Sequence, residues 1–186
     1  MSQTHSGSSK VALKLALAAV LTAVTVVFTM IVRIPTAKGY INLGDVAICF
    51  TAFTFGPWSA FIAGGLGTAL ADLISGYAQW APISFIVHGL EGLAIALLVR
   101  SRVKSDDGAE AEIVIPLWRK ILAGVVGMVI VAGGYFVGGG AFISGFSVAA
   151  VEIPANLLQS GVGVVLGLAV SQAVRRAYPP VRSLAW

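Results

Sequence analysis

Residues 45–56, DVAICFTAFTFG, decide the fold because they are apolar enough to enter a membrane but too few to cross one. Pro57 follows them, and a Gly-Pro pair is typical of a turn. A helix rises about 1.5 Å per residue, so this stretch reaches about 18 Å. The hydrocarbon core of a bilayer is about 30 Å thick. If the turn lies at one face of the membrane, Asp45 therefore lies well below the other face.

The connection before this stretch, residues 33–44, must dip into the membrane to reach Asp45. Irregular backbone at membrane depth is tolerated only where it is buried in protein or lines a cavity. The short helix and its connection therefore predict a pocket that opens to one side of the membrane.

The composition also indicates a membrane protein. Of the 186 residues, 58% are hydrophobic and 11% are charged, whereas soluble domains are about 45–50% apolar and about 25% charged. This excludes a soluble enzyme, a disordered chain and a nucleic-acid binder despite the net charge of +4. The one cysteine excludes an internal disulfide and a cysteine-based zinc cluster, and we expect neither a metal site nor a cofactor.

Five longer apolar runs accompany the short one. They cover residues 15–32, 58–74, 82–100, 117–137 and 141–174. Together the six predict an all-α integral membrane protein with six transmembrane helices in one domain.

Around these spans we expect a disordered leader (residues 1–9), a membrane domain (10–176) with a solvated loop (101–116), and a tail (177–186). Pro154 falls inside the last run and predicts a kink there.

The basic residues indicate the orientation. Six crossings place both termini on one side, and ten of the twelve Lys and Arg residues fall on that side; only Arg33 and Lys38 fall on the other. Because cytoplasmic loops carry the excess of Lys and Arg, both termini are predicted to be cytoplasmic and the pocket to face outward.

Four of the eight acidic residues lie in or beside the apolar runs. They are Asp45, Asp72, Glu91 and Glu152. A charge at the centre of a spanning helix costs about 2.5–3.5 kcal/mol, so such residues are functional candidates that should face the bundle interior.

Other polar and aromatic residues accompany these acids. His88 lies three residues before Glu91, and therefore on the same helix face. Asn156 and Gln159 continue the stripe that begins at Glu152, and Tyr77 and Trp80 follow Asp72 in the chain. Convergent polar groups with aromatic rings predict a pocket for a small ligand.

Structural alternatives remain open for several of these residues. Asp45 is placed to cap its helix, and His88 with Glu91 is also suited to a purely structural hydrogen bond. Tyr77 and Trp80 equally suit the aromatic belt of a membrane interface.

Several short motifs in the chain resemble the substrate-binding S components of energy-coupling factor (ECF) transporters. They are GYINLGD (39–45), FGP (55–57), GGLGTALAD (64–72), GY (76–77), WAP (80–82), GLEG (89–92) and EIPAN (152–156). The resemblance covers residues 10–174. It is strongest with the branch associated with pyridoxine, hydroxymethylpyrimidine and related vitamin precursors.

This resemblance implies a six-helix subunit of the bacterial or archaeal plasma membrane without enzymatic activity. Such a subunit captures a vitamin and works with a transmembrane coupling protein and two cytoplasmic ATPases. The resemblance further implies a gating loop, here 35–44 with Tyr40. It also implies an Ala-x-x-x-Ala docking motif, for which Ala19 and Ala23 fit and an earlier pair, Ala12 and Ala16, is the alternative.

We expect this chain to bind a small vitamin or vitamin precursor. The candidate polar contacts are Asn42, Asp45, Asp72, His88, Glu91, Glu152, Asn156 and Gln159, with Tyr77 and Trp80 stacking on a heteroaromatic ring. The competing hypothesis is an autonomous proton-coupled carrier or an intramembrane enzyme that uses the buried acids.

Overall fold

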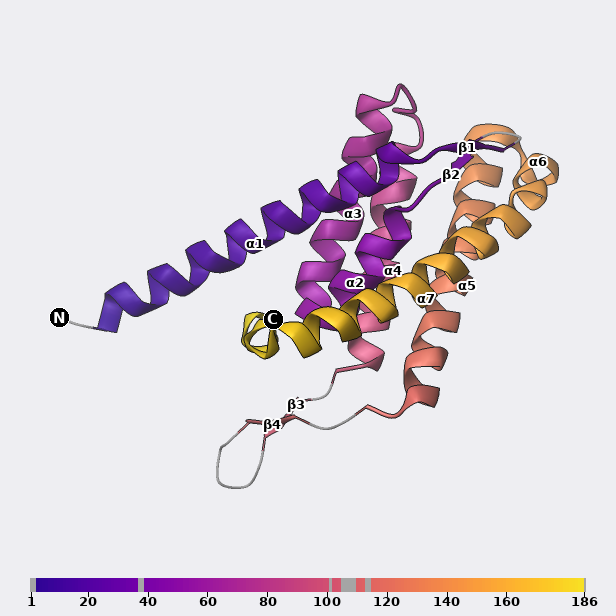
Figure 1. Cartoon of the computed structure of the whole chain (residues 1–186). Coiled ribbons are helices and arrows are strands. Elements are labelled where there is room, and N and C mark those ends of the chain that lie inside the picture. The colour runs from indigo at the N-terminus through magenta and orange to yellow at the C-terminus, as the bar shows by residue number, and fades with distance from the viewer. Residues whose placement is uncertain (1–2, 37–38, 101, 105–109, 113–114, 186) are drawn as a thin grey trace.

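The structure, a computed structural model, describes residues 3–36, 39–100, 102–104, 110–112 and 115–185. Helices dominate this part of the chain (Figure 1). The long ones are α1 (Gln3–Ile31), α3 (Pro57–Ile74), α4 (Ala81–Leu98), α5 (Leu117–Gly139) and α7 (Ile153–Ala177). Each of these five provides a segment that is long and apolar enough to cross a membrane.

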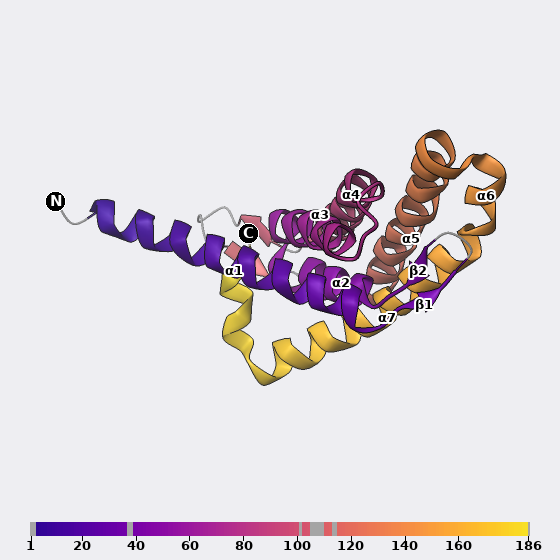
Figure 2. The ribbon, with the colours of Figure 1, turned by 90° about the horizontal axis from the view of Figure 1, so that it is seen from above.

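The short helix α2 (Gly44–Phe55) lies at the centre of the bundle. It has 12 residues, and all of them except Phe50 are buried. It packs against α1, α3, α4 and α7 (Figures 1 and 2). The expected short apolar helix is therefore present, and it is surrounded by protein rather than by lipid.

The outer surface of the bundle is largely apolar. Large hydrophobic side chains are exposed on every long helix, among them Leu15 on α1, Leu73 on α3 and Val165 on α7. A soluble protein would bury much of this surface. In a membrane, the same side chains face lipid. The chain is accordingly a multi-pass membrane protein.

Small residues allow α7 to approach α2 closely. Gly163 and Gly167 lie one turn apart on α7 and contact Asp45 and Cys49 on α2. A methyl group on Gly167 would lie 2.6 Å from the Cys49 Cβ and 2.9 Å from the Val46 carbonyl oxygen. This is the close backbone packing that small residues four apart permit in membranes.

Between α1 and α2 the chain forms a short hairpin. Strands β1 (Ile34–Pro35) and β2 (Tyr40–Ile41) pair antiparallel, with Pro35 opposite Tyr40. The Thr36 backbone N–H donates to the Gly39 carbonyl at 3.0 Å and helps close the turn. We call residues 34–41 the β1–β2 hairpin. Of its turn, residues 37–38, with Lys38 among them, lie outside the described part.

The break between the last two expected spans is at Gly145, not at Gly138. The glycines at 138–140 remain helical, because α5 continues into a π-helical turn, Gly140–Ser144. Gly145 has φ 80°, a conformation that a side chain disfavours, and it ends this helix. The short helix α6 (Phe146–Val151) follows.

The predicted kink at Pro154 is instead a helix start. α7 begins at Ile153, so Pro154 occupies the first turn, where its missing N–H needs no partner. Glu152 is therefore the residue before α7 rather than a mid-helix acid.

Three expected irregular segments contain regular structure. Residues 3–9 of the expected leader continue α1, since extending an existing helix costs far less than starting one. The expected solvated loop contains an antiparallel pair, β3 (Arg102–Lys104) and β4 (Glu110–Glu112), with basic positions opposite acidic ones. The tail forms a 3-10 helix (Pro179–Leu184), and Val181 is buried against Leu21 and Phe55.

We predict that Gly167→Ala destabilises the protein, because its methyl group overlaps α2; overpacking of this kind costs about 1–3 kcal/mol. Gly133→Ala is the matched control, since no atom of a neighbour lies within 4 Å of its added methyl group. Alanine is the better helix former by about 1 kcal/mol. Thermal unfolding in detergent should show a lower midpoint for Gly167→Ala and an unchanged or higher one for Gly133→Ala. Equal midpoints would contradict the packing of α7 on α2.

Candidate ligand-binding site

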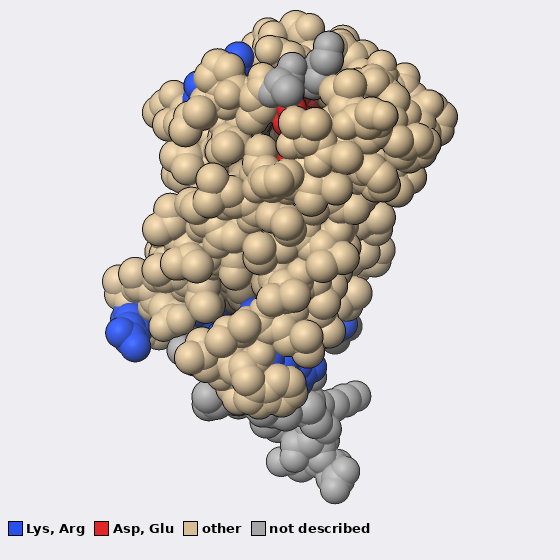
Figure 3. Space-filling view, turned by 90° about the vertical axis from the view of Figure 1, so that its right-hand side faces the viewer, with Lys and Arg blue, Asp and Glu red and all other residues tan. Residues whose placement is uncertain are grey.

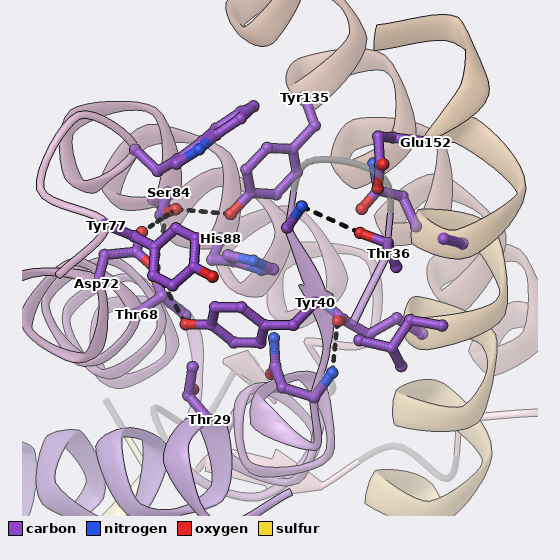
Figure 4. Close-up of a pocket in the computed structure, with 17 residues that line it drawn as sticks. Thr29, Thr36, Tyr40, Thr68, Asp72, Tyr77, Ser84, His88, Tyr135 and Glu152 are labelled. Carbon is purple, nitrogen blue, oxygen red and sulfur yellow. Dashed lines mark hydrogen bonds between the residues drawn. The ribbon is translucent and has the colours of Figure 1, made fainter. Parts of the chain in front are cut away.

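A pocket lies between the β1–β2 hairpin and the ends of α1, α3, α4, α5 and α7 (Figure 4). Its empty volume is about 660 Å³, open mouth included. Acidic residues are visible inside a hollow near one end of the molecule, whereas Lys and Arg gather mainly towards the other (Figure 3). Nine of the predicted residues line the pocket: Tyr40, Asn42, Asp72, Tyr77, Trp80, His88, Glu152, Asn156 and Gln159.

The hairpin and the residues after it form one wall of the pocket. The Asn42 backbone N–H donates to the Gln159 Oε1 atom on α7 at 2.8 Å. The Asn42 Oδ1 atom accepts a hydrogen bond of 2.7 Å from the Gly44 N–H, which closes a turn at the start of α2. The connection is thus held between α2 and α7, and it lines a cavity as expected.

A chain of hydroxyl groups surrounds the Asp72 carboxylate. The Ser84 hydroxyl lies 2.6 Å from Asp72 Oδ2 and donates to it. The same Ser84 oxygen is 2.6 Å from the Tyr135 hydroxyl. On the other side, the Tyr40 hydroxyl donates to Asp72 Oδ1 at 3.3 Å. These contacts join α3, α4, α5 and the hairpin around one carboxylate (Figure 4).

Aromatic rings pack in pairs around this carboxylate. The Tyr40 and Tyr77 rings meet edge to face at 5.2 Å, and Trp80 lies 5.8 Å from Tyr135. Tyr77 and Trp80 therefore belong to the pocket wall, whatever contact they also make with the membrane interface. The Arg33 guanidinium lies over the Tyr40 ring at 5.2 Å. Burial and the Asp72 carboxylate raise the pKa of Tyr40 to about 12, so its hydroxyl stays protonated and able to donate.

The facing wall comes from the start of α7. Glu152 precedes the helix, and Asn156 and Gln159 follow at the predicted spacing, so all three side chains line the same cavity. Figure 4 shows Glu152 across the pocket from Asp72. The space between them has an acid on both sides and aromatic rings at one end.

Asp45 and Glu91 do not line the pocket but lie behind His88. Asp45 is 1% exposed and Glu91 is 0% exposed. The His88 Nδ1 atom is 2.9 Å from Glu91 Oε2 and 3.2 Å from Asp45 Oδ1. We call these three residues the carboxylate–histidine cluster. The expected pairing of His88 with Glu91 is present.

The alternative reading of Asp45 as a helix cap is wrong. No side-chain hydrogen bond caps α2. Instead Asp45 Oδ2 accepts hydrogen bonds from Ser160 Oγ at 2.9 Å and from Gln159 Nε2 at 3.3 Å, both on α7. Asp45 therefore joins α2 to α7 and α4.

Eight further pocket residues were not named as candidate contacts in the sequence analysis, although three of them lie in the expected gating loop: Thr29, Thr36, Gly39, Ile41, Thr68, Ser84, Tyr135 and Ala155. Two of them had a usable signal, since Thr68 lies four residues before Asp72 and Ser84 four before His88, on the same helix faces. Tyr135 had none, because its position depends on how α5 packs against α4.

The carboxylate–histidine cluster also has the composition of a metal site. Each of its three residues offers one possible metal-ligand atom, and these atoms lie within 4.8 Å of one another. Among the described residues, no second group of this kind is present. The expectation that the chain has no metal site stays a prediction.

The fold and site together define a helical membrane protein with a polar, aromatic-lined pocket for a small molecule. Residues 10–176 match the family of ECF-type riboflavin transporter S components, and the chain belongs to that family.

Two relatives are similar over most of their length. A thiamine precursor transporter, HmpT, from Lactococcus lactis subsp. cremoris is 32% identical over 166 residues, 88% of each chain. A protein of Pyrococcus woesei described as an uncharacterized protein in gap 3'region is 32% identical over 163 residues, 86% of this chain and 99% of the relative. The family and HmpT are described as transport proteins, which indicates a transporter component rather than an enzyme.

We predict that the stability of the protein falls as the pH rises from about 10 to about 12, and that Tyr40→Phe removes part of this fall. The pKa of Tyr40 is about 12 in the folded protein and 10.0 ordinarily, so the unfolded chain loses this proton first. Unfolding midpoints measured across this pH range test the prediction. Identical pH profiles for the two proteins would contradict it.

Proposed function

We propose that this chain is the substrate-capture subunit of an ECF-type importer and binds a small heteroaromatic vitamin or vitamin precursor. The observation that carries the proposal is the pocket, which combines two carboxylates with four tyrosine and tryptophan side chains inside a membrane protein of the S-component family. Such a mixture of apolar walls and a few convergent polar groups is typical of small-ligand sites.

The pocket chemistry favours a flat ring that carries hydrogen-bond donors. Tyr77 and Trp80 offer faces and edges for stacking. Asp72 and Glu152 accept hydrogen bonds from amino or hydroxyl groups, and Asn156 both donates and accepts. Hydroxymethylpyrimidine and pyridoxine are rings of this kind. The name of the relative HmpT, a thiamine precursor transporter, supports the first of them.

We further propose six crossings with both termini in the cytoplasm and the pocket open to the outside of the cell. In this arrangement α2 is the sixth membrane segment, which does not span the bilayer by itself, and the β1–β2 hairpin with Tyr40 is the gate over the ligand. The distribution of Lys and Arg, ten against two, supports this orientation. The membrane would be the plasma membrane of a bacterium or an archaeon.

The proposed partners are a transmembrane coupling protein and two cytoplasmic ATPases. Ala19 and Ala23 are exposed on α1, where a partner helix could approach closely. The earlier pair, Ala12 and Ala16, is exposed as well, so exposure leaves both registers open.

We predict that Asp72→Asn and Glu152→Gln each weaken binding of hydroxymethylpyrimidine by about tenfold or more. A hydrogen bond to a charged group contributes about 1.5–3 kcal/mol, and a tenfold change in Kd is about 1.4 kcal/mol. Quenching of tryptophan fluorescence measures binding, with Trp80→Phe identifying the signal from the pocket. Pyridoxine and riboflavin serve as competing ligands.

Glu112→Gln is the control for this experiment, since Glu112 lies on β4, in the connection between α4 and α5. It should bind as the unmodified protein does. Unchanged affinity in both Asp72→Asn and Glu152→Gln would refute the assignment of this pocket.

We predict that leucine at Ala19 and Ala23 abolishes co-purification with the coupling protein while vitamin binding by the isolated chain is retained. The larger side chains block close helix approach on the exposed face of α1. The matched double variant carries leucine at Ala12 and Ala16. If only that variant loses the partner, the docking register is the earlier one.

The buried carboxylates beside His88 favour a second candidate, an autonomous proton-coupled carrier. Uptake into vesicles separates the two functions. The ECF proposal requires the coupling protein, the ATPases and ATP, whereas the carrier would need only this chain and a proton gradient.

A further inference from the structure

The carboxylate–histidine cluster contains a polar atom that has no hydrogen-bond partner. Asp45 Oδ1 is buried and receives no hydrogen bond, although it lies 3.2 Å from His88 Nδ1. The Glu91 Oε2 atom lies closer to the same nitrogen, at 2.9 Å. A single Nδ1–H can serve only one of two carboxylates, so the other is left facing the cluster without a donor.

Leaving a carboxylate unpaired here is costly. Buried charges in proteins are normally paired or coordinate a metal, and within a membrane domain the cost of an uncompensated charge is higher still. The second oxygen of Asp45 is satisfied by Ser160 and Gln159. The unpartnered Oδ1 atom therefore indicates a partner that the side chains of this protein do not provide.

We propose that Asp45, His88 and Glu91 bind one divalent transition-metal ion, Zn²⁺ or Mn²⁺, behind the ligand pocket. Atoms coordinated at about 2.0–2.2 Å from one such ion lie about 3 Å from each other. This is the separation of His88 Nδ1 from both carboxylate oxygens, 2.9 and 3.2 Å. All three ligand atoms lie within 4.8 Å of one another, so a small contraction completes the site.

Charge and ligand type select the ion. Two carboxylates and a neutral imidazole carry two negative charges, which one divalent ion cancels and a monovalent ion does not. An imidazole ligand favours transition metals over Mg²⁺ and Ca²⁺, which prefer oxygen ligands alone.

His88 connects this site to the pocket. It is the cluster member that lines the cavity, and an ion on Nδ1 would leave its Nε2–H as a donor directed away from the carboxylates. The ion would thus fix the orientation of one pocket residue. The inference rests on the cluster alone and does not depend on which molecule the pocket binds.

The test is the metal content and metal response of the full chain in detergent, purified through a tag without histidines. We expect about one Zn²⁺ or Mn²⁺ per chain by mass spectrometry of the metal. After removal by a chelator, adding Zn²⁺ or Mn²⁺ should raise the unfolding midpoint by several degrees, and Mg²⁺ should not. Glu91→Gln and Asp45→Asn should each lower the metal affinity tenfold or more.

Asp72→Asn is the matched control, a buried carboxylate outside the cluster, and it should keep the metal. A stripped protein that does not respond to Zn²⁺ or Mn²⁺ would overturn the proposal and leave protons as the occupants. Metal retained by both Glu91→Gln and Asp45→Asn would show an adventitious ion and overturn it too. If these variants do not fold, X-ray absorption of the Zn²⁺-loaded unmodified protein decides, since it must show one imidazole among oxygen ligands.

Discussion

Helix α2 is too short to cross a bilayer. The rest of the structure depends on what occupies the part of the membrane thickness that α2 does not span. Its 12 residues are surrounded by α1, α3, α4 and α7, so its backbone polar groups at both ends lie inside the protein. Asn42 closes the turn before the helix, and Gly56 with φ 91° ends it. The β1–β2 hairpin and the pocket beneath it occupy the part of the membrane thickness that α2 does not span.

The two acidic groups of the site follow from the same constraint. Around the pocket, Asp72 accepts hydrogen bonds from hydroxyl groups on two other segments and faces a cavity large enough for a small ring. Behind it, Asp45 and Glu91 share one nitrogen of the pocket residue His88, and Asp45 also accepts a hydrogen bond from the pocket residue Gln159. Asp72 is suited to hold a ligand that carries hydrogen-bond donors. Asp45 and Glu91 are suited to hold the pocket wall in place.

The hydropathy pattern predicts the helices well, because apolar runs of sufficient length have few alternatives in a membrane. It fails at helix ends, where glycines at 138–140 remain helical and only Gly145 adopts a positive φ. Spacing along one helix predicts the meeting of His88 with Glu91. It does not predict Tyr135, whose place depends on Gly134 packing against Val87 on the neighbouring helix. Contacts between helices need the three-dimensional packing.

The most direct test of the account is labelling of Ala155→Cys in whole cells by a membrane-impermeant maleimide. Ala155 lines the pocket, and the one native cysteine, Cys49, is 0% exposed and gives no background. Ala169→Cys, exposed on α7 away from the pocket, is the control. The account predicts that Ala155→Cys is labelled from outside and that saturating hydroxymethylpyrimidine protects it. Labelling only from the cytoplasm, or labelling that the vitamin precursor leaves unchanged, would contradict it.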